Sequence, residues 1–281
     1  MSSGKGGFQT FDFHYEGRSI RYRAIGEGPL IVMLHGWMHS GRRWAHIARH
    51  LSDRYTCLIP DLPGFGDSPS LPRREMCIRR YGDLLARLII EWRPDRRPHA
   101  IIAHSMGGLA TLEMTGRGWI RPERIMVLSV PSEGLSDNFQ FWRTPWLLTV
   151  MFSLARMMTL HTAARFLQVY GFLMLGRWRA VKRSLLEDFL DSDPATNELL
   201  FRELYDYHVR PELLQRLRTV PISVVRGEYD RIVKPEHSQR LAKLLGGEYR
   251  CERGHGHTPM LRGEQSFLRY LDEFLGRDTS F

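Results

Sequence analysis

Two patterns of hydrophobic and polar positions alternate along the first half of the chain. The opening segments, 10–17 and 18–26, alternate apolar and polar residues and meet at Glu16-Gly17, so they predict an antiparallel hairpin. Short apolar runs, typical of strands buried on both faces, follow at 29–36, 55–64, 99–105 and 123–131. Segments with helical spacing lie between them, at 41–53, 74–92 and 106–118. This alternation predicts a parallel sheet with helices on both faces.

The pattern changes after residue 131. From about Ser132 to Leu217 no segment has a convincing strand pattern, and the sequence is helical and rich in Phe, Trp, Met and Leu. Strand and helix patterns then return, at 219–227, 236–245, 246–254 and 264–275. We therefore expect one α/β domain in two parts, 1–131 and 218–281, interrupted by an all-helical insertion at 132–217.

The composition is that of a globular chain with a large core. Hydrophobic residues make up 43% of the 281 positions and charged residues 25%. The three cysteines are scattered without CxxC spacing, which favours reduced intracellular thiols over a zinc site or a disulfide framework. The N-terminus lacks the pattern of a signal peptide, and the longest stretch without Asp, Glu, Lys, Arg or His, 144–155, is too short to span a bilayer. We expect a cytoplasmic protein.

The formal net charge is +9, which fits either a solvated basic surface or an acidic partner. No DNA- or RNA-binding motif accompanies the charge, so we do not expect a nucleic-acid partner. Part of the charge lies in the insertion, where residues 139–183 contain basic side chains and no acidic one. These are Arg143, Arg156, Arg165, Arg177, Arg179, Lys182 and Arg183.

Ser105 lies at the corner between the apolar run 99–105 and the helical segment 106–118. Its surroundings, A-H-S-M-G, match the nucleophile elbow G-x-S-x-G with Ala103 in place of the first glycine. A small residue there lets strand and helix cross closely. A buried serine that caps the helix is the alternative interpretation.

A nucleophilic serine needs a base, and the base needs an acid that orients it. Asp230 follows the strand pattern at 219–227, and His255 and His257 follow the one at 246–254. Both loops would leave the same edge of a parallel sheet as Ser105, where open α/β sheets place their ligands.

The chain resembles the α/β-hydrolase superfamily in the segments "LHGW", "DLPGFGDS", "AHSMGG", "GEYDRIVKP" and "GHTPM", which span residues 30–275 apart from the insertion. The resemblance implies an α/β-hydrolase fold, with a mostly parallel eight-stranded sheet and helices on both faces. It makes the insertion the family's helical cap, or lid. It also implies that Ser105 is the nucleophile, His257 the base and Asp230 the acid.

Alternatives exist for two of these assignments. The family pattern places the histidine directly before x-P, which selects His257 over His255. Some family members carry the acid after the strand that here is 123–131, which makes Glu133 the alternative to Asp230. We read His104, beside the nucleophile, and His35, in "LHGW", as structural residues.

The resemblance also locates an oxyanion hole. One backbone N–H comes from the residue after the nucleophile, Met106, and the other from the loop after the third strand, at Trp37. No cofactor or metal is expected, because the histidines form no ligand pattern and "GFGDSP" lacks the nicotinamide-binding fingerprint.

A serine at the elbow favours acyl transfer, since family members that open epoxides or displace halides carry Asp there. We expect a carboxylic ester hydrolase that works through an acyl-enzyme on Ser105. A carbon–carbon bond or lactone hydrolase is the alternative, and a binding protein or membrane-surface protein that retains the fold is a third reading.

The substrate is indicated by the insertion, which is rich in aromatic and Met side chains and basic at the same time. An apolar pocket under a cationic lid suits a small ester with an apolar acyl group, or an acyl chain on an acidic carrier protein. The segments "LHGW" and "DLPGFG" and the basic insertion resemble the carboxylesterases that demethylate pimeloyl-carrier-protein methyl ester. The basic lid also leaves contact with a membrane surface open.

Overall fold

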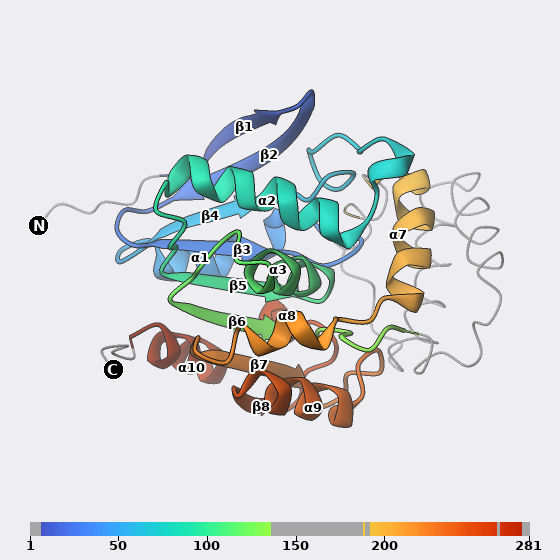
Figure 1. Ribbon diagram of the computed structural model, residues 1–281. Helices are drawn as coiled ribbons and strands as arrows, with labels where there is room; N and C mark the ends of the chain where they lie inside the picture. The colour runs from blue at the N-terminus through green and yellow to red at the C-terminus, as the bar shows by residue number, and fades with distance from the viewer. Residues whose placement is uncertain (1–6, 136–187, 189–191, 263–264, 277–281) are drawn as a thin grey trace, which may run out of the picture.

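The opening hairpin and the apolar runs that follow it form one sheet. A computed structural model of the chain describes residues 7–135, 188, 192–262 and 265–276 (Figure 1). The strands are β1 (Gln9–Tyr15), β2 (Arg18–Ile25), β3 (Leu30–Leu34), β4 (Thr56–Pro60), β5 (Ala100–His104), β6 (Arg124–Leu128), β7 (Ile222–Gly227) and β8 (Glu248–Glu252). Their order in the sheet is β1-β2-β4-β3-β5-β6-β7-β8. The pairs β1–β2 and β2–β4 are antiparallel, and all other neighbours are parallel, which confirms the predicted sheet.

Helices cover both faces of this sheet (Figure 1). The helices are α1 (Ala45–Leu51), α2 (Ile78–Trp92), α3 (Met106–Gly116), α7 (Pro194–Asp206), α8 (Pro211–Gln215), α9 (Pro235–Leu245) and α10 (Gln265–Gly276). Single 3-10 turns lie at Gly41–Trp44 (η1), Arg73–Glu75 (η2) and Pro259–Arg262 (η4). Side chains of α2, α3, α7, α8 and α9 share one hydrophobic core, and those of α1 and α10 share a second core on the opposite face.

The central strands divide their side chains between the two cores. In β3, Val32 and Leu34 belong to the first core, whereas Ile31 and Met33 belong to the second. Successive side chains of a strand point to opposite faces, so a strand covered on both sides must be apolar at every position. This explains why the sequence shows unbroken apolar runs here and alternation only in the hairpin.

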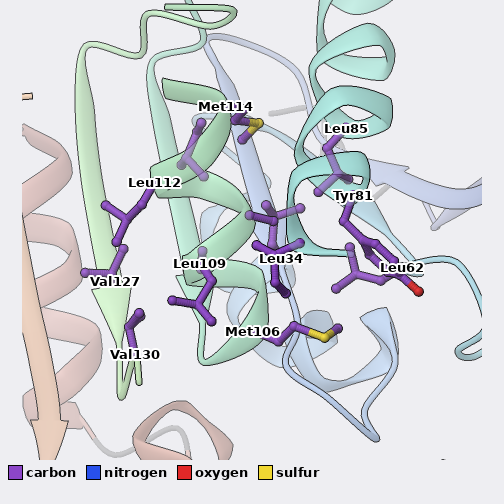
Figure 2. Close-up of a cluster of buried hydrophobic side chains, with 14 of the residues drawn as sticks. Leu34, Leu62, Tyr81, Leu85, Met106, Leu109, Leu112, Met114, Val127 and Val130 are labelled. Atoms are coloured by element: carbon purple, nitrogen blue, oxygen red, sulfur yellow. The ribbon is translucent and has the colours of Figure 1, made fainter. Parts of the chain in front are cut away.

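Helix α3 is buried along its whole length. Figure 2 shows several of its hydrophobic side chains. The α3 side chains Met106, Leu109 and Leu112 lie in the same core as Leu34 of β3 and Val127 of β6. A helix without a solvent-facing side cannot be amphipathic, and the sequence of α3 accordingly lacks a polar stripe. Its N-terminus is thereby fixed rigidly against the end of β5, where Ser105 lies.

The helical insertion is described only in part. Its last segment forms α7 and α8, and an isolated antiparallel bridge between Glu133 and His208 joins the two chain segments at its base. The stretch 144–155 and the basic segment 139–183 lie outside the described residues, and the boundaries at 132 and 217 stay predictions. Within the parts of the chain that the structure describes, none of the helices is long and apolar enough to cross a bilayer.

Candidate active site

Ser105 occupies a sharp corner between β5 and α3. Its backbone has φ 50° and ψ −116°, a conformation that residues other than glycine rarely adopt. The Ser105 N–H donates to the carbonyl of Leu128 at 2.8 Å, which ties the corner to the end of β6. The side chain makes no hydrogen bond that caps α3. The Ser105 side chain therefore does not close the helix, which argues against the helix-cap interpretation.

Small residues allow this corner to form. A Cβ atom at Gly107 would lie 2.5 Å from the carbonyl oxygen of His35, and one at Gly36 would lie 3.1 Å from the Cβ of Ser105. Both glycines are therefore required by the close approach of the elbow to the loop after β3. The same approach brings Trp37, the residue after Gly36, to the elbow.

Two further loops meet Ser105 at the carboxyl edge of the sheet. Asp230 lies in the loop after β7, and His257 lies in the loop after β8. His257 Nε2 is 3.1 Å from Ser105 Oγ, and His257 Nδ1 is 3.1 Å and 3.0 Å from the two carboxylate oxygens of Asp230. The structure thus brings together the three side chains that the sequence singled out, and hydrogen bonds connect Asp230 to His257 and His257 to Ser105.

The Asp230 carboxylate is 5% exposed and well supplied with donors. Its Oδ1 accepts from the backbone N–H groups of Ile232 at 2.8 Å and Val233 at 3.0 Å. Burial alone would raise the pKa of Asp230, but the electrostatic interaction and hydrogen bond with His257, together with the Val233 N–H, outweigh it and lower the pKa to about 2. The carboxylate stays ionised and can hold a proton on His257 Nδ1, which leaves Nε2 as the acceptor facing Ser105.

The alternative residues, Glu133 and His255, make contacts of their own. Glu133 forms an ion pair with Arg240 at 3.0 Å and lies 3.6 Å from His237 of α9. His255 is 2% exposed, and its backbone carbonyl accepts from the Tyr229 N–H at 2.7 Å, which joins the two loops that carry Asp230 and His257. Asp230 and His257 are therefore the pair that the hydrogen bonds connect to Ser105.

The two backbone N–H groups predicted to form the oxyanion hole are those of Met106, which follows Ser105 in the sequence, and Trp37, which follows Gly36. Met106 is the first residue of α3, and the first N–H groups of a helix have no acceptor within the helix. Trp37 follows Gly36, which packs directly on Ser105. The Trp37 ring is partly buried. Its centroid lies 5.5 Å from that of Phe201 in α7, and the centroid of Phe201 lies 6.1 Å from that of Tyr205.

His35 and His104 both have structural contacts, and those of His104 reach the candidate base. His35 Nδ1 bonds to the carbonyl of Gly36 at 2.8 Å, and its Nε2 accepts from the Leu62 N–H at 2.8 Å. His104 Nε2 lies 2.8 Å from the backbone carbonyl of His257, with the two rings 4.9 Å apart. Its place next to Ser105 in the sequence gave no sign of this contact, because it depends on the return of the β8 loop.

His104 is neutral under ordinary conditions. Burial lowers the pKa of His104 to about 3, and the neighbouring His257 ring adds to this effect. A neutral imidazole has one N–H, and the contact with the His257 carbonyl places that N–H on Nε2. His104 therefore holds the backbone of His257 without adding a positive charge beside it.

We predict that His104→Phe lowers kcat by on the order of 10-fold, because the phenyl ring keeps the packing but cannot donate to the His257 carbonyl. His104→Gln, which can place a side-chain N–H near the position of Nε2, is expected to retain more of the activity. Initial rates with a chromogenic ester would measure both. Equal losses in the two variants would show that the hydrogen bond is not what matters.

No metal site accompanies this arrangement among the residues that the structure describes, where no group of three or more His, Cys, Asp or Glu side chains could hold an ion. The Ser–His–Asp hydrogen-bond chain is the type that activates a serine hydroxyl for attack on a carbonyl carbon.

Comparison with known proteins places the chain in a family. A pimeloyl-acyl-carrier-protein methyl ester esterase of Nitrosospira multiformis is 27% identical over 270 residues, covering 94% of this chain and 98% of that protein. A thermophilic esterase from Thermogutta terrifontis has the same fold, with a TM-score of 0.75 at 18% identity over 95% of this chain and 98% of that one. So does the N-acyl homoserine lactonase AidH complexed with N-butanoyl homoserine, with a TM-score of 0.74 at 20% identity over 97% and 98% of the two chains. The family model described as "Alpha/beta hydrolase family" matches residues 31–269, and the chain belongs to this family.

Proposed function

We propose that this protein is a serine esterase that hydrolyses a carboxylic ester through an acyl-enzyme on Ser105. The observation that carries the proposal is the hydrogen-bond chain from Asp230 through His257 to Ser105 Oγ. The relatives that are esterases by name agree with hydrolysis of an ester bond.

In the first half of the reaction, His257 Nε2 takes the proton of Ser105 as Oγ attacks the ester carbonyl carbon. The carbonyl π electrons move to oxygen, and the N–H groups of Met106 and Trp37 stabilise the resulting oxyanion. When the tetrahedral intermediate collapses, the carbon–oxygen bond to the alcohol breaks and His257 gives its proton to the leaving alkoxide. The alcohol departs, and the acyl group stays on Ser105.

Water completes the cycle. His257 Nε2 removes a proton from water, whose oxygen attacks the acyl carbonyl, and a second oxyanion forms in the same hole. Collapse breaks the bond to Ser105 Oγ, which regains its proton from His257, and the carboxylic acid leaves. Throughout, the Asp230 carboxylate holds His257 Nδ1–H and offsets the charge of the imidazolium.

The substrate that we propose is an ester with an apolar acyl group, carried as a small molecule or on an acidic acyl carrier protein. The name of the Nitrosospira relative supports this class, since that protein is a methyl ester esterase for a pimeloyl acyl-carrier protein. The rings of Trp37, Phe201 and Tyr205 form an aromatic cluster that begins at the residue after Gly36, which approaches Ser105 closely. The basic segment 139–183 of the sequence would complement an acidic carrier.

The experiment compares hydrolysis of methyl esters of increasing acyl length, free and attached to acyl carrier protein, with hydrolysis of a β-diketone and an N-acyl homoserine lactone. We expect the methyl esters to be preferred, with an optimum at medium acyl length. A preference for the diketone or the lactone would replace the ester assignment with the carbon–carbon bond or lactone hydrolase alternative. Contact with a membrane surface and a cytoplasmic location stay predictions.

A further inference from the structure

The turn that carries Trp37 is strained. The His39 N–H donates to the carbonyl of Gly36 at 3.2 Å, so residues 36–39 form a tight turn, and Met38 within it has φ 58°. A side chain other than glycine in this left-handed region costs free energy, and such a conformation persists only where surrounding contacts enforce it. The contacts that hold this turn are therefore also those that fix the direction of the Trp37 N–H.

Asp188 supplies two of those contacts from a distant part of the chain. One of its carboxylate oxygens accepts from Ser40 Oγ at 2.7 Å, and the other from Arg43 Nε at 2.5 Å. Ser40 directly follows the strained turn. All three residues are buried: Ser40 is 0% exposed, Arg43 7% and Asp188 3%. Asp188 belongs to the predicted insertion, whereas Ser40 and Arg43 belong to the loop after β3.

Two other contacts show how closely this loop is tied to the reacting groups. The Gly41 N–H donates to Asp61 Oδ1 at 2.6 Å, which anchors the far side of Ser40 to the loop after β4. The His39 ring stacks on the ring of His104 at 5.4 Å between centroids, and His104 holds the backbone of His257. Movement of the turn would thus reach both the Trp37 N–H and the base.

We propose that Asp188 is a positioning residue, which orients the Trp37 N–H of the oxyanion hole by holding Ser40 and Arg43. This inference rests on the proposed serine mechanism. Loss of the carboxylate leaves the Arg43 charge buried without this partner and frees Ser40 to follow a relaxed turn. The oxyanion then loses a hydrogen-bond donor. Because the oxyanion exists only in the tetrahedral intermediate and its transition states, binding of the ground-state ester is not weakened.

The test compares Asp188→Asn with a matched control, Asp193→Asn. The amide keeps the volume of the carboxylate but removes the charge that faces Arg43. Asp193 lies in the same predicted insertion, and its carboxylate accepts from the Thr196 N–H at 2.7 Å as the cap of α7, away from the turn. The control therefore makes the same carboxylate-to-amide change within the insertion and leaves the contacts of Asp188 with Ser40 and Arg43 in place.

We expect Asp188→Asn to lower kcat by at least about 10-fold with KM changed less than about twofold. The affinity for a trifluoromethyl ketone, whose adduct with Ser105 carries an oxyanion, should fall by a similar factor. Asp193→Asn should leave both quantities within about twofold of wild type. Wild-type kcat and ketone affinity in Asp188→Asn, measured well below its unfolding temperature, would overturn the proposal, as would equal losses in the control.

Ser40→Ala gives a second route if Asp188→Asn does not fold. It removes one donor to Asp188 and keeps the ion pair with Arg43, so a smaller loss of kcat and of ketone affinity is expected, again with KM unchanged. Unchanged kcat in a folded Ser40→Ala would then decide against the proposal. Failure of the serine mechanism itself is recognised separately, because the wild type would then neither hydrolyse esters nor bind the ketone.

Discussion

Ser105→Ala is expected to reduce kcat for ester hydrolysis by about 10⁶-fold, because no other hydroxyl can take its place at the elbow. The variant should still bind the ester, since most of the binding surface is unchanged. A fluorophosphonate probe, which reacts only with activated serines, should label wild type at position 105 and leave the variant unlabelled. Mass spectrometry of the labelled peptide identifies the modified residue.

The control for this variant is Ser238→Ala. Ser238 is 1% exposed in α9, and its hydroxyl has no hydrogen-bond partner among the described residues. Removing a buried hydroxyl there should change neither kcat nor labelling. If Ser105→Ala kept its activity, or if the probe modified another residue, the nucleophile would have to be sought elsewhere in the chain.

The fold could be predicted because the sheet imposes its periodicity on the sequence. Strands such as β3 and β5 are covered on both faces, so their unbroken apolar runs distinguish them from the alternating hairpin β1–β2. The order of the strands does not follow from such runs. The antiparallel pairing of β2 with β4 joins segments whose side chains carry no mark of their partner.

The three central residues of the site could also be placed from the sequence. Each follows a strand of the parallel part of the sheet, and the carboxyl ends of parallel strands share one edge. Once the strands are recognised, Ser105, Asp230 and His257 must lie at that edge. The local order of small residues around Ser105 then follows from the close crossing of β5, α3 and the loop after β3.

Contacts between distant segments explain what the sequence did not reveal. Asp188 and Ser40 are 148 positions apart, and neither lies in a recognisable motif. The bond from His104 to the His257 carbonyl spans 153 positions and ends on a backbone atom, which leaves no trace in the identity of residue 257. The strain at Met38 is likewise invisible, since methionine does not favour the conformation that the turn imposes on it.

Asp230→Asn is expected to reduce kcat by about 10⁴-fold, the loss seen when the acid of a comparable triad is replaced by its amide. The asparagine can donate to His257 Nδ1, which then carries the lone pair, and the proton moves to Nε2. In that tautomer His257 can no longer accept the proton of Ser105. Steady-state rates with a medium-chain methyl ester measure the loss.

Glu133→Gln is the control, because Glu133 was the alternative acid and is instead paired with Arg240. We expect its kcat to stay within about twofold of wild type. A large loss in Glu133→Gln together with an active Asp230→Asn would reverse the assignment of the acid. The two variants make the same chemical change, so the comparison isolates the position of the carboxylate.

The Asp230 carboxylate should also affect the stability of the folded protein at low pH. Its pKa is lowered to about 2, against an ordinary value of 3.8, so the ionised form stabilises the folded state above about pH 4 and this contribution disappears as the pH falls through 2. The full contribution is about 2 kcal/mol, of which about 1 kcal/mol is lost between pH 5 and pH 3. Urea unfolding at these two pH values should therefore show a steeper loss for wild type than for Asp230→Asn. Equal pH dependence in both proteins would mean that Asp230 is not held ionised by His257 and its backbone donors, and the electrostatic basis for its role as the acid would fail with it.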